Sequence, residues 1–199
     1  MVNDFNALHN QFTSFQEQCK SCLGISALHI ETNRQVHFNA EHHFFMCSTY
    51  KLPIAVCLLQ QVAIGQIQLS QLYEVTEFDL RIGVLSTLNQ FNFSHANLHI
   101  SVGNLLQLML QESCNSATDI LLRLIGGPPA VMNCLHRAGV QDLHIEHYTL
   151  ELLAALDGIE NLPANHQCSP NQYKKLEQLV TPKQRLKARM AFKINLNFG

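Results

Sequence analysis

The stretch that decides the fold is Phe45-Met46-Cys47-Ser48-Thr49-Tyr50-Lys51-Leu52-Pro53. If it opens a helix, Ser48 and Lys51 lie one turn apart on the same face. An amine in that position can take the proton of a serine hydroxyl, which is a poor nucleophile without an adjacent base. The partial positive charge of a helix N-terminus also favours an alkoxide and opposes protonation of the amine. The spacing therefore predicts a reactive pair, although a surface lysine one turn after a helix cap would show the same pattern.

A second polar group follows further along the chain, at Ser113-Cys114-Asn115. It falls between two strongly apolar stretches that we expect to be helical, so a short turn can present a hydroxyl and an amide to a shared cleft. Taken alone, the same group is more typical of a solvated turn between helices. Its occurrence together with the first pair favours a catalytic site.

These motifs and the segments around them resemble the class A serine β-lactamases, which use a Ser-x-x-Lys pair for acyl transfer. The resemblance covers roughly residues 5–180. Its segments follow in the family's order and spacing: Leu23-Gly24-Ile25-Ser26-Ala27-Leu28, Val36-His37-Phe38-Asn39, the Ser48 segment, Ile100-Ser101-Val102-Gly103-Asn104-Leu105-Leu106, Ser113-x-Asn115-x-Ala117, Leu121-Leu122 and Ile125-Gly126-Gly127-Pro128.

The resemblance implies a role for each residue of the site. Ser48 is the expected nucleophile, Lys51 the proton acceptor, and Ser113 the group that passes the proton to the departing ring nitrogen. Asn115 is expected to hold Lys51 and the substrate side chain, and the backbone N–H of Ser48 to form half of the oxyanion hole. No metal or organic cofactor is implied, and the expected partner is a small β-lactam bound by a monomer.

The expected fold is α+β, a helical lobe packed on an antiparallel sheet, in a single domain over residues 1–199. Residues 5–45 are predicted to form a helix and a β-hairpin, with strands near 23–30 and 35–39. Residues 46–180 are predicted to form the helical lobe, with helices near 52–64, 101–112, 116–125 and 129–138. Residues 181–199 form a tail that diverges from the family.

Composition sets wider limits. The 199 residues are 47% hydrophobic and 14% charged, as in a folded globular protein. The net charge of −2 shows no excess of basic residues of the kind that binds nucleic acid. No apolar run approaches the ~20 residues of a membrane span. The first residues lack a basic segment followed by an apolar one, so no signal peptide is expected, and a complete chain would then be cytoplasmic. The resemblance instead implies a periplasmic or secreted protein.

The seven cysteines do not form an obvious disulfide framework, because their number is odd. Cys19 and Cys22 continue an apolar stripe with helical spacing, which predicts that they face a core rather than a metal. Cys47 stands where some family members have a disulfide, but no partner segment is evident. The spacing of His144 and His147 matches no established zinc site.

Two departures from the family concern activity. The loop after Gly139 aligns Thr149 with the family's catalytic Glu and Leu153 with its Asn partner. Threonine cannot act as a carboxylate base, and Glu151 would replace it only if the loop changed register; an ordinary surface acid is the alternative.

The second departure is the segment after Leu156, which matches neither the family's last three strands nor their Lys-Thr/Ser-Gly motif. The sheet is therefore expected to be incomplete and the chain truncated relative to the family. Alternation in Phe192, Ile194, Leu196 and Phe198 predicts one further half-buried strand.

Three functions stay open on the sequence. The first is a serine β-lactamase-like hydrolase that works through a Ser48 acyl-enzyme. The second is a penicillin-binding acyl trap with little turnover, and the third is a non-catalytic homologue built on the helical lobe.

Overall fold

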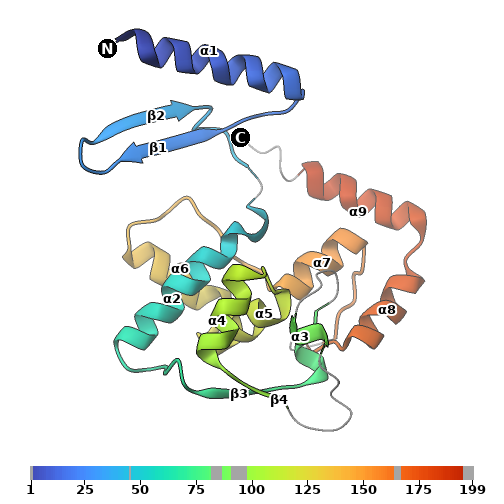
Figure 1. Ribbon diagram of the computed structural model, residues 1–199. Coiled ribbons are helices and arrows are strands. Elements are labelled where there is room, and N and C mark those ends of the chain that lie inside the picture. The colour runs from blue at the N-terminus through green and yellow to red at the C-terminus, as the bar shows by residue number, and fades with distance from the viewer. Residues whose placement is uncertain (1, 45, 82–86, 91–97, 164–166, 195–199) are drawn as a thin grey trace. The chain divides into compact units, whose positions relative to one another are not determined.

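A computed structural model describes residues 2–44, 46–81, 87–90, 98–163 and 167–194 of the chain (Figure 1). The chain divides into two compact units, one formed by Met1–Phe45 with Ile194–Gly199 and the other by Met46–Lys193. Each unit is described by itself. That both belong to one domain over residues 1–199 stays a prediction.

The first unit consists of helix α1 (Val2–Cys19) and an antiparallel hairpin of β1 (Ile25–His29) and β2 (Arg34–Phe38). The Phe38 ring packs against His9 and Phe12 of α1. Asn39 Nδ2 donates to Leu23 O at 2.8 Å and to Gln16 Oε1 at 3.1 Å, which ties the end of the hairpin to the helix. The predicted helix and strands are confirmed, with bounds shifted by a few residues.

The predicted burial of two cysteines in this unit is wrong, because Cys19 and Cys22 are both exposed. Cys19 is the last residue of α1, and Cys22 lies in the loop that follows. Phe38 of the hairpin contacts α1 at His9 and Phe12. Both contacts lie before Cys19 and Cys22 in the chain. An apolar stripe predicts a face that can be buried, but burial also needs a partner long enough to cover it.

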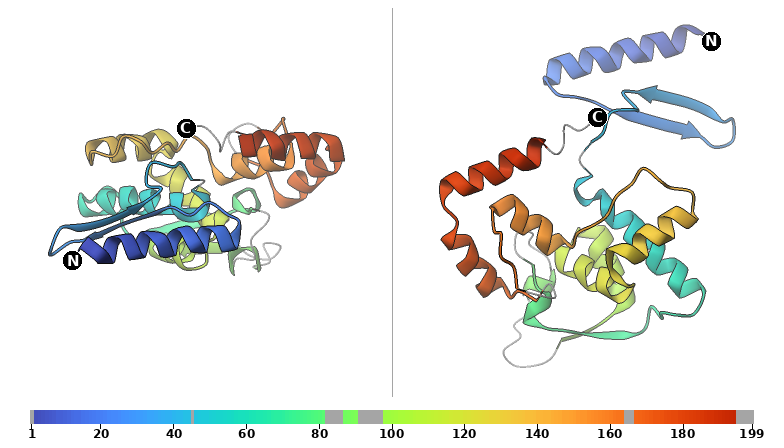
Figure 2. Two further views of the ribbon diagram at one scale, coloured as in Figure 1. Left: turned by 90° about the horizontal axis from the view of Figure 1, so that it is seen from above. Right: turned by 180° about the vertical axis from the view of Figure 1, so that it is seen from behind.

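The second unit is mainly helical, and α2 (Lys51–Ala63) is central to it. This helix lies against α4 (Val102–Gln111), α5 (Asn115–Leu124) and α6 (Gly127–Arg137), as the views in Figures 1 and 2 agree. Ile54 and Leu58 of α2 are fully buried, as are the side chains of Ile120, Leu121 and Leu122 in α5. The helices predicted for these segments are therefore confirmed, and their apolar faces form the core.

Side chains and glycines fix where these helices begin. Ser101 Oγ accepts from Asn104 N at 3.1 Å and caps α4, and Cys114 Sγ accepts from Ala117 N at 3.3 Å at the start of α5. Gly126 has φ +103°, a conformation that residues with a Cβ rarely adopt, and this allows α5 to end and α6 to begin within two residues.

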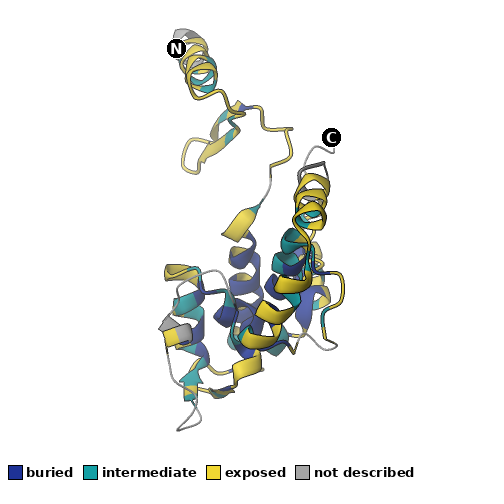
Figure 3. Cartoon of the chain, turned by 90° about the vertical axis from the view of Figure 1, so that its right-hand side faces the viewer, coloured by how far each residue is buried: buried dark blue, intermediate teal, exposed yellow. Residues whose placement is uncertain are grey.

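The remaining elements surround this core. They are the 3₁₀ turns η1 (Cys47–Tyr50) and η2 (Glu77–Asp79), α3 (Thr87–Gln90), α7 (Thr149–Asp157), α8 (Pro170–Leu179) and α9 (Pro182–Ile194), and the antiparallel pair β3 (Leu72–Val75) and β4 (Leu98–Ser101). Leu150, Ala154 and Tyr173 belong to a smaller apolar cluster between α7 and α8. Burial decreases toward α9, as Figure 3 shows.

Within the described residues, the strands form two separate two-stranded sheets. This confirms the predicted α+β class with an incomplete sheet. The predicted strand at the end of the chain is wrong for Phe192–Ile194, which belong to α9, while Leu196 and Phe198 lie outside the described residues. Pro182 at the start of a segment rich in Lys, Arg, Ala and Leu favours a helix, and this local propensity prevails over the short alternating pattern.

None of the helices in the ranges given above is both long and apolar enough to cross a membrane.

Candidate active site

Ser48 lies in η1, three residues before Lys51, the first residue of α2, and it is exposed. Cys47, which precedes it, has φ +46°, in the left-handed region. For a residue with a Cβ this conformation costs about 1–2 kcal/mol and persists only where the surrounding structure enforces it. Strain of this kind often marks a functional turn, and here it sets the backbone that carries the serine.

Lys51 is buried, with 3% of its surface exposed, and its amine is the centre of the site. Its Nζ lies 2.9 Å from Ser113 Oγ, 2.6 Å from Ser113 O and 2.9 Å from Asn115 Oδ1. Ser48 Oγ lies 3.5 Å from the same nitrogen. The structure thus brings together Ser48, Lys51, Ser113 and Asn115, while their catalytic roles stay predictions.

The burial of Lys51 affects how readily its amine gives up a proton. Burial lowers its pKa from the ordinary value, and electrostatic interactions with Cys114 and Asp119 oppose this shift. Two of the acceptors around Nζ, Ser113 O and Asn115 Oδ1, are carbonyl oxygens that can only accept. A neutral amine satisfies both with its two hydrogens, and its lone pair is then left for a hydroxyl proton. The site can therefore hold Lys51 as a base without leaving a carbonyl unsatisfied.

The Ser113 turn is built so that its carbonyl and its hydroxyl both reach Lys51. Ser113 has φ +55°, another left-handed residue with a Cβ. Immediately after it, α5 begins, with Cys114 as its N-cap and Asn115 as its first residue. Thr118 Oγ1 donates to Cys114 O at 2.7 Å, which anchors the turn to the helix.

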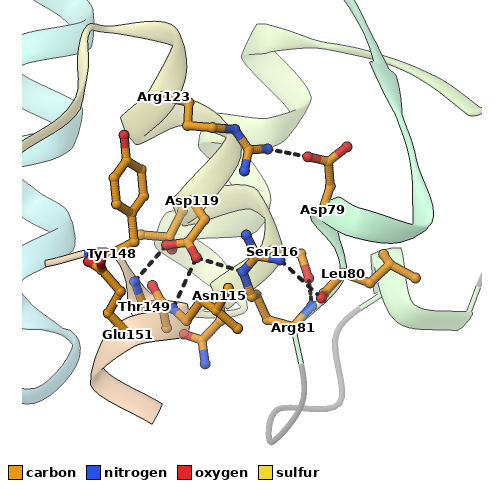
Figure 4. A network of polar contacts seen from close by, with 12 residues as sticks. Asp79, Leu80, Arg81, Asn115, Ser116, Asp119, Arg123, Tyr148, Thr149 and Glu151 are labelled. Carbon is orange, nitrogen blue, oxygen red and sulfur yellow. Dashed lines mark hydrogen bonds and ion pairs between the residues drawn. The ribbon is translucent and has the colours of Figure 1, made fainter. Parts of the chain in front are cut away.

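A buried carboxylate holds the start of α7, and sequence reasoning missed it. Asp119 Oδ1 accepts from Thr149 N at 2.7 Å, and Oδ2 accepts from Leu150 N at 3.1 Å and from Arg81 Nε at 2.6 Å (Figure 4). Both side chains of the Asp119–Arg81 pair are inaccessible to solvent. An acid placed against the positive end of a helix is favourable, and here it fixes the position of Thr149.

Arg81 in turn fixes the preceding loop. Its backbone N donates to Ser116 Oγ at 2.9 Å, and its Nη1 donates to Phe78 O at 2.7 Å. Near it, Arg123 pairs with Asp79 at the edge of the same network (Figure 4). The sequence signal for this network was an acid directly before the apolar run Ile120-Leu121-Leu122 of α5, since Lys, Glu, Arg and Asp are almost never fully buried unless paired.

The structure places Thr149 and Glu151 at the start of α7. The Thr149 hydroxyl is buried and hydrogen-bonded to the hydroxyl of Tyr50, whose pKa burial raises. Glu151 Oε2 accepts from Tyr148 N at 2.8 Å and lies 3.6 Å from His147 Nδ1. These contacts hold the Glu151 carboxylate at the helix start (Figure 4), and its catalytic role stays a prediction.

No three His, Cys, Asp or Glu side chains of the described residues form a group suited to a metal ion. All seven cysteines lie in described segments and are free thiols, including the exposed Cys47 beside Ser48.

Comparison with known proteins gives one family. The model of the β-lactamase enzyme family matches residues 6–193. A β-lactamase of Bacillus licheniformis is 29% identical over 150 residues, which cover 75% of this chain and 47% of that protein. β-Lactamase CTX-M-97 of Escherichia coli is 27% identical over 158 residues, which cover 76% of this chain and 53% of that protein. The chain spans about half the length of these curated relatives.

Solved structures share the fold. TLA-3 extended-spectrum β-lactamase superposes with a TM-score of 0.69 at 23% identity, covering 91% of this chain and 66% of that one. A β-lactamase from Chitinophaga pinensis superposes with a TM-score of 0.68 at 20% identity, covering 93% of this chain and 68% of that one.

Proposed function

This chain belongs to the β-lactamase enzyme family, and from that premise we propose that it opens β-lactam rings through an acyl-enzyme on Ser48. The observation that carries the proposal is the position of Lys51 Nζ. It lies 3.5 Å from Ser48 Oγ and 2.9 Å from Ser113 Oγ, between the nucleophile and the second hydroxyl. This is the arrangement that proton transfer from one hydroxyl to the other requires.

Acylation then takes two steps. Neutral Lys51 accepts the Ser48 proton while Ser48 Oγ bonds to the β-lactam carbonyl carbon, and the backbone N–H of Ser48 donates to the developing oxyanion. The carbonyl then re-forms as the C–N bond breaks. The ring nitrogen takes the proton of Ser113, which is replaced from the Lys51 ammonium, so Lys51 returns to its neutral form. Asn115 holds the amine through its carbonyl oxygen.

Hydrolysis of the acyl-enzyme needs a base for water, and a second candidate function follows from this point. Thr149 aligns with the family's catalytic carboxylate, and its hydroxyl is hydrogen-bonded to the hydroxyl of Tyr50. A hydroxyl in that position cannot ionise near neutral pH. If Glu151 does not take over the role, the protein is an acyl trap, in which Ser48 is acylated and released slowly.

The test combines a chromogenic cephalosporin with intact-mass measurement of the protein after mixing with penicillin. The wild type is expected to gain the mass of the intact penicillin, because ring opening on the serine loses no atoms. Ser48→Ala is expected to gain nothing, and Ser21→Ala, a change of an exposed serine elsewhere, should behave as the wild type.

The outcomes separate the functions. Repeated cephalosporin cleavage supports the hydrolase, whereas an adduct that persists without turnover supports the trap. In the second case, Thr149→Glu should shorten the lifetime of the adduct. Neither cleavage nor an adduct would overturn the proposal and leave the non-catalytic homologue.

We also propose that the protein acts as a monomer, in the periplasm or outside the cell, as the family resemblance implies. Size-exclusion chromatography with light scattering tests the first statement, and cell fractionation of the native host tests the second.

A further inference from the structure

Charge is distributed very unevenly along the chain. Residues 170–194 contain seven Lys and Arg and one acidic residue, whereas the rest of the chain contains six Lys and Arg and fourteen Asp and Glu. The net charge of −2 hides this asymmetry. Most of the basic residues of the segment belong to α9.

One side of α9 packs on the rest of its unit. Arg185 and Ala188 are half-buried, and a Cβ at Gly158 would lie 3.4 Å from the Ala188 methyl carbon. Arg185 Nη1 pairs with Glu177 Oε1 at 3.3 Å, so its charge is compensated within the fold. These contacts determine which side of the helix faces outward.

The outward side combines exposed apolar and basic side chains. Leu186 and Met190 are 61% and 56% exposed and lie one turn apart, so they form a short stripe. With about 3.6 residues per turn, Lys183 and Lys187 fall along one border of the stripe and Arg189 along the other. All three are exposed, and Arg189 lies 4.0 Å from Asp157, a distance at which an exposed pair contributes little.

We propose that this face of α9 binds anionic phospholipid surfaces. The helix would lie in the plane of the membrane with Leu186 and Met190 inserted between headgroups. Lys183 and Lys187 would contact lipid phosphates through their amines while their methylene chains follow the apolar stripe. Charge complementarity favours an anionic partner, and the aliphatic stripe favours lipid over nucleic acid, which offers no apolar phase.

The proposal is independent of the Ser48 site. It is tested by sedimentation of the full-length protein with vesicles of phosphatidylcholine alone or mixed with phosphatidylglycerol, at low and at high salt. The protein should sediment with the anionic vesicles, remain in solution with the neutral ones, and be released by high salt. Equal binding to both kinds of vesicle would overturn the proposal.

Two variants locate the surface. Lys183→Gln with Lys187→Gln should weaken binding to anionic vesicles by about 25-fold, at about fivefold per lysine. Lys174→Gln with Lys175→Gln removes the same charge from α8 and should weaken binding by less than about threefold. Equal loss in the two pairs would mean that net charge alone attracts the protein, and would overturn the assignment to α9.

A third variant tests the apolar stripe. Leu186→Ser with Met190→Ser should reduce sedimentation with anionic vesicles but leave retention on heparin, a polyanion without an apolar phase, unchanged. Unchanged vesicle binding, or a parallel loss on heparin, would overturn the membrane interpretation. Circular dichroism of each variant confirms that it is folded.

Discussion

Replacement of Asp119 by Asn is the sharpest test of how the start of α7 is held. The carboxylate accepts three hydrogen bonds, from Thr149 N, Leu150 N and Arg81 Nε, in a place without solvent. Asn has the same shape, but its amide NH2 group replaces one carboxylate oxygen. This group donates hydrogen bonds and cannot accept one from the N–H that faces it. The variant therefore leaves an N–H group without an acceptor and removes the negative charge that pairs with Arg81 Nε.

The expected loss of stability follows from this loss of partners. Removing one member of a buried ion pair costs about 3–5 kcal/mol, a large part of the about 5–15 kcal/mol by which typical domains are stable. With a urea dependence of about 2 kcal/mol per molar, the midpoint of unfolding should fall by about 2 M. Urea unfolding followed by circular dichroism measures this shift.

A matched control is Asp142→Asn, the same change at an exposed acid, which should alter stability by less than about 0.5 kcal/mol. Arg81→Met and the double variant complete a cycle, and the double variant should lose clearly less than the sum of the two single losses. An Asp119→Asn midpoint equal to that of the control would refute the reasoning, as would additive losses in the cycle.

Three further predictions concern titration and local structure. Lys51 loses its proton as pH rises, so the rate of Ser48 acylation, measured by mass spectrometry, should increase with pH. Because burial lowers the pKa of Lys51, the rate should level off below the ordinary lysine value of 10.5. A flat profile would contradict Lys51 as the base. Burial raises the pKa of Tyr50, so the folded state holds this proton where the unfolded state loses it, and stability should decline as pH rises above about 10. Tyr50→Phe should show a shallower alkaline decline in urea titrations, and an equally steep one would assign the effect elsewhere. Ser101→Ala removes the cap of α4 and should cost about 1 kcal/mol in urea unfolding, whereas Ser101→Asn should retain most of the stability.

The local parts of the site were predictable because they depend on short spacings. The Ser48 and Lys51 pair follows from one helical turn, and the helices of the core follow from apolar periodicity. The resemblance to a family then joined Ser113 and Asn115 to this pair. The structure places the side chains of Ser48, Ser113 and Asn115 around Lys51 Nζ.

The parts that sequence reasoning missed depend on distant partners. Asp119 meets Arg81 and Thr149 only after the chain has folded, and no local pattern states which donors surround a buried acid. The exposed Cys19 shows the same limit in reverse, because an apolar stripe does not say how much surface will cover it. The error at Phe192 arose because a short alternating pattern fits a strand and a helix end alike.

The left-handed backbones of Cys47 and Ser113 make the reactivity of Ser48 sensitive to whether both turns are folded. Isolated peptides carrying either segment would relax to ordinary turns and lose the alignment of hydroxyl and amine. If Ser48 is acylated as proposed, the labelled fraction under a short pulse of β-lactam counts the molecules in which both turns are formed. Pulse labelling across a denaturant series would then follow assembly of the catalytic region separately from the bulk loss of helix.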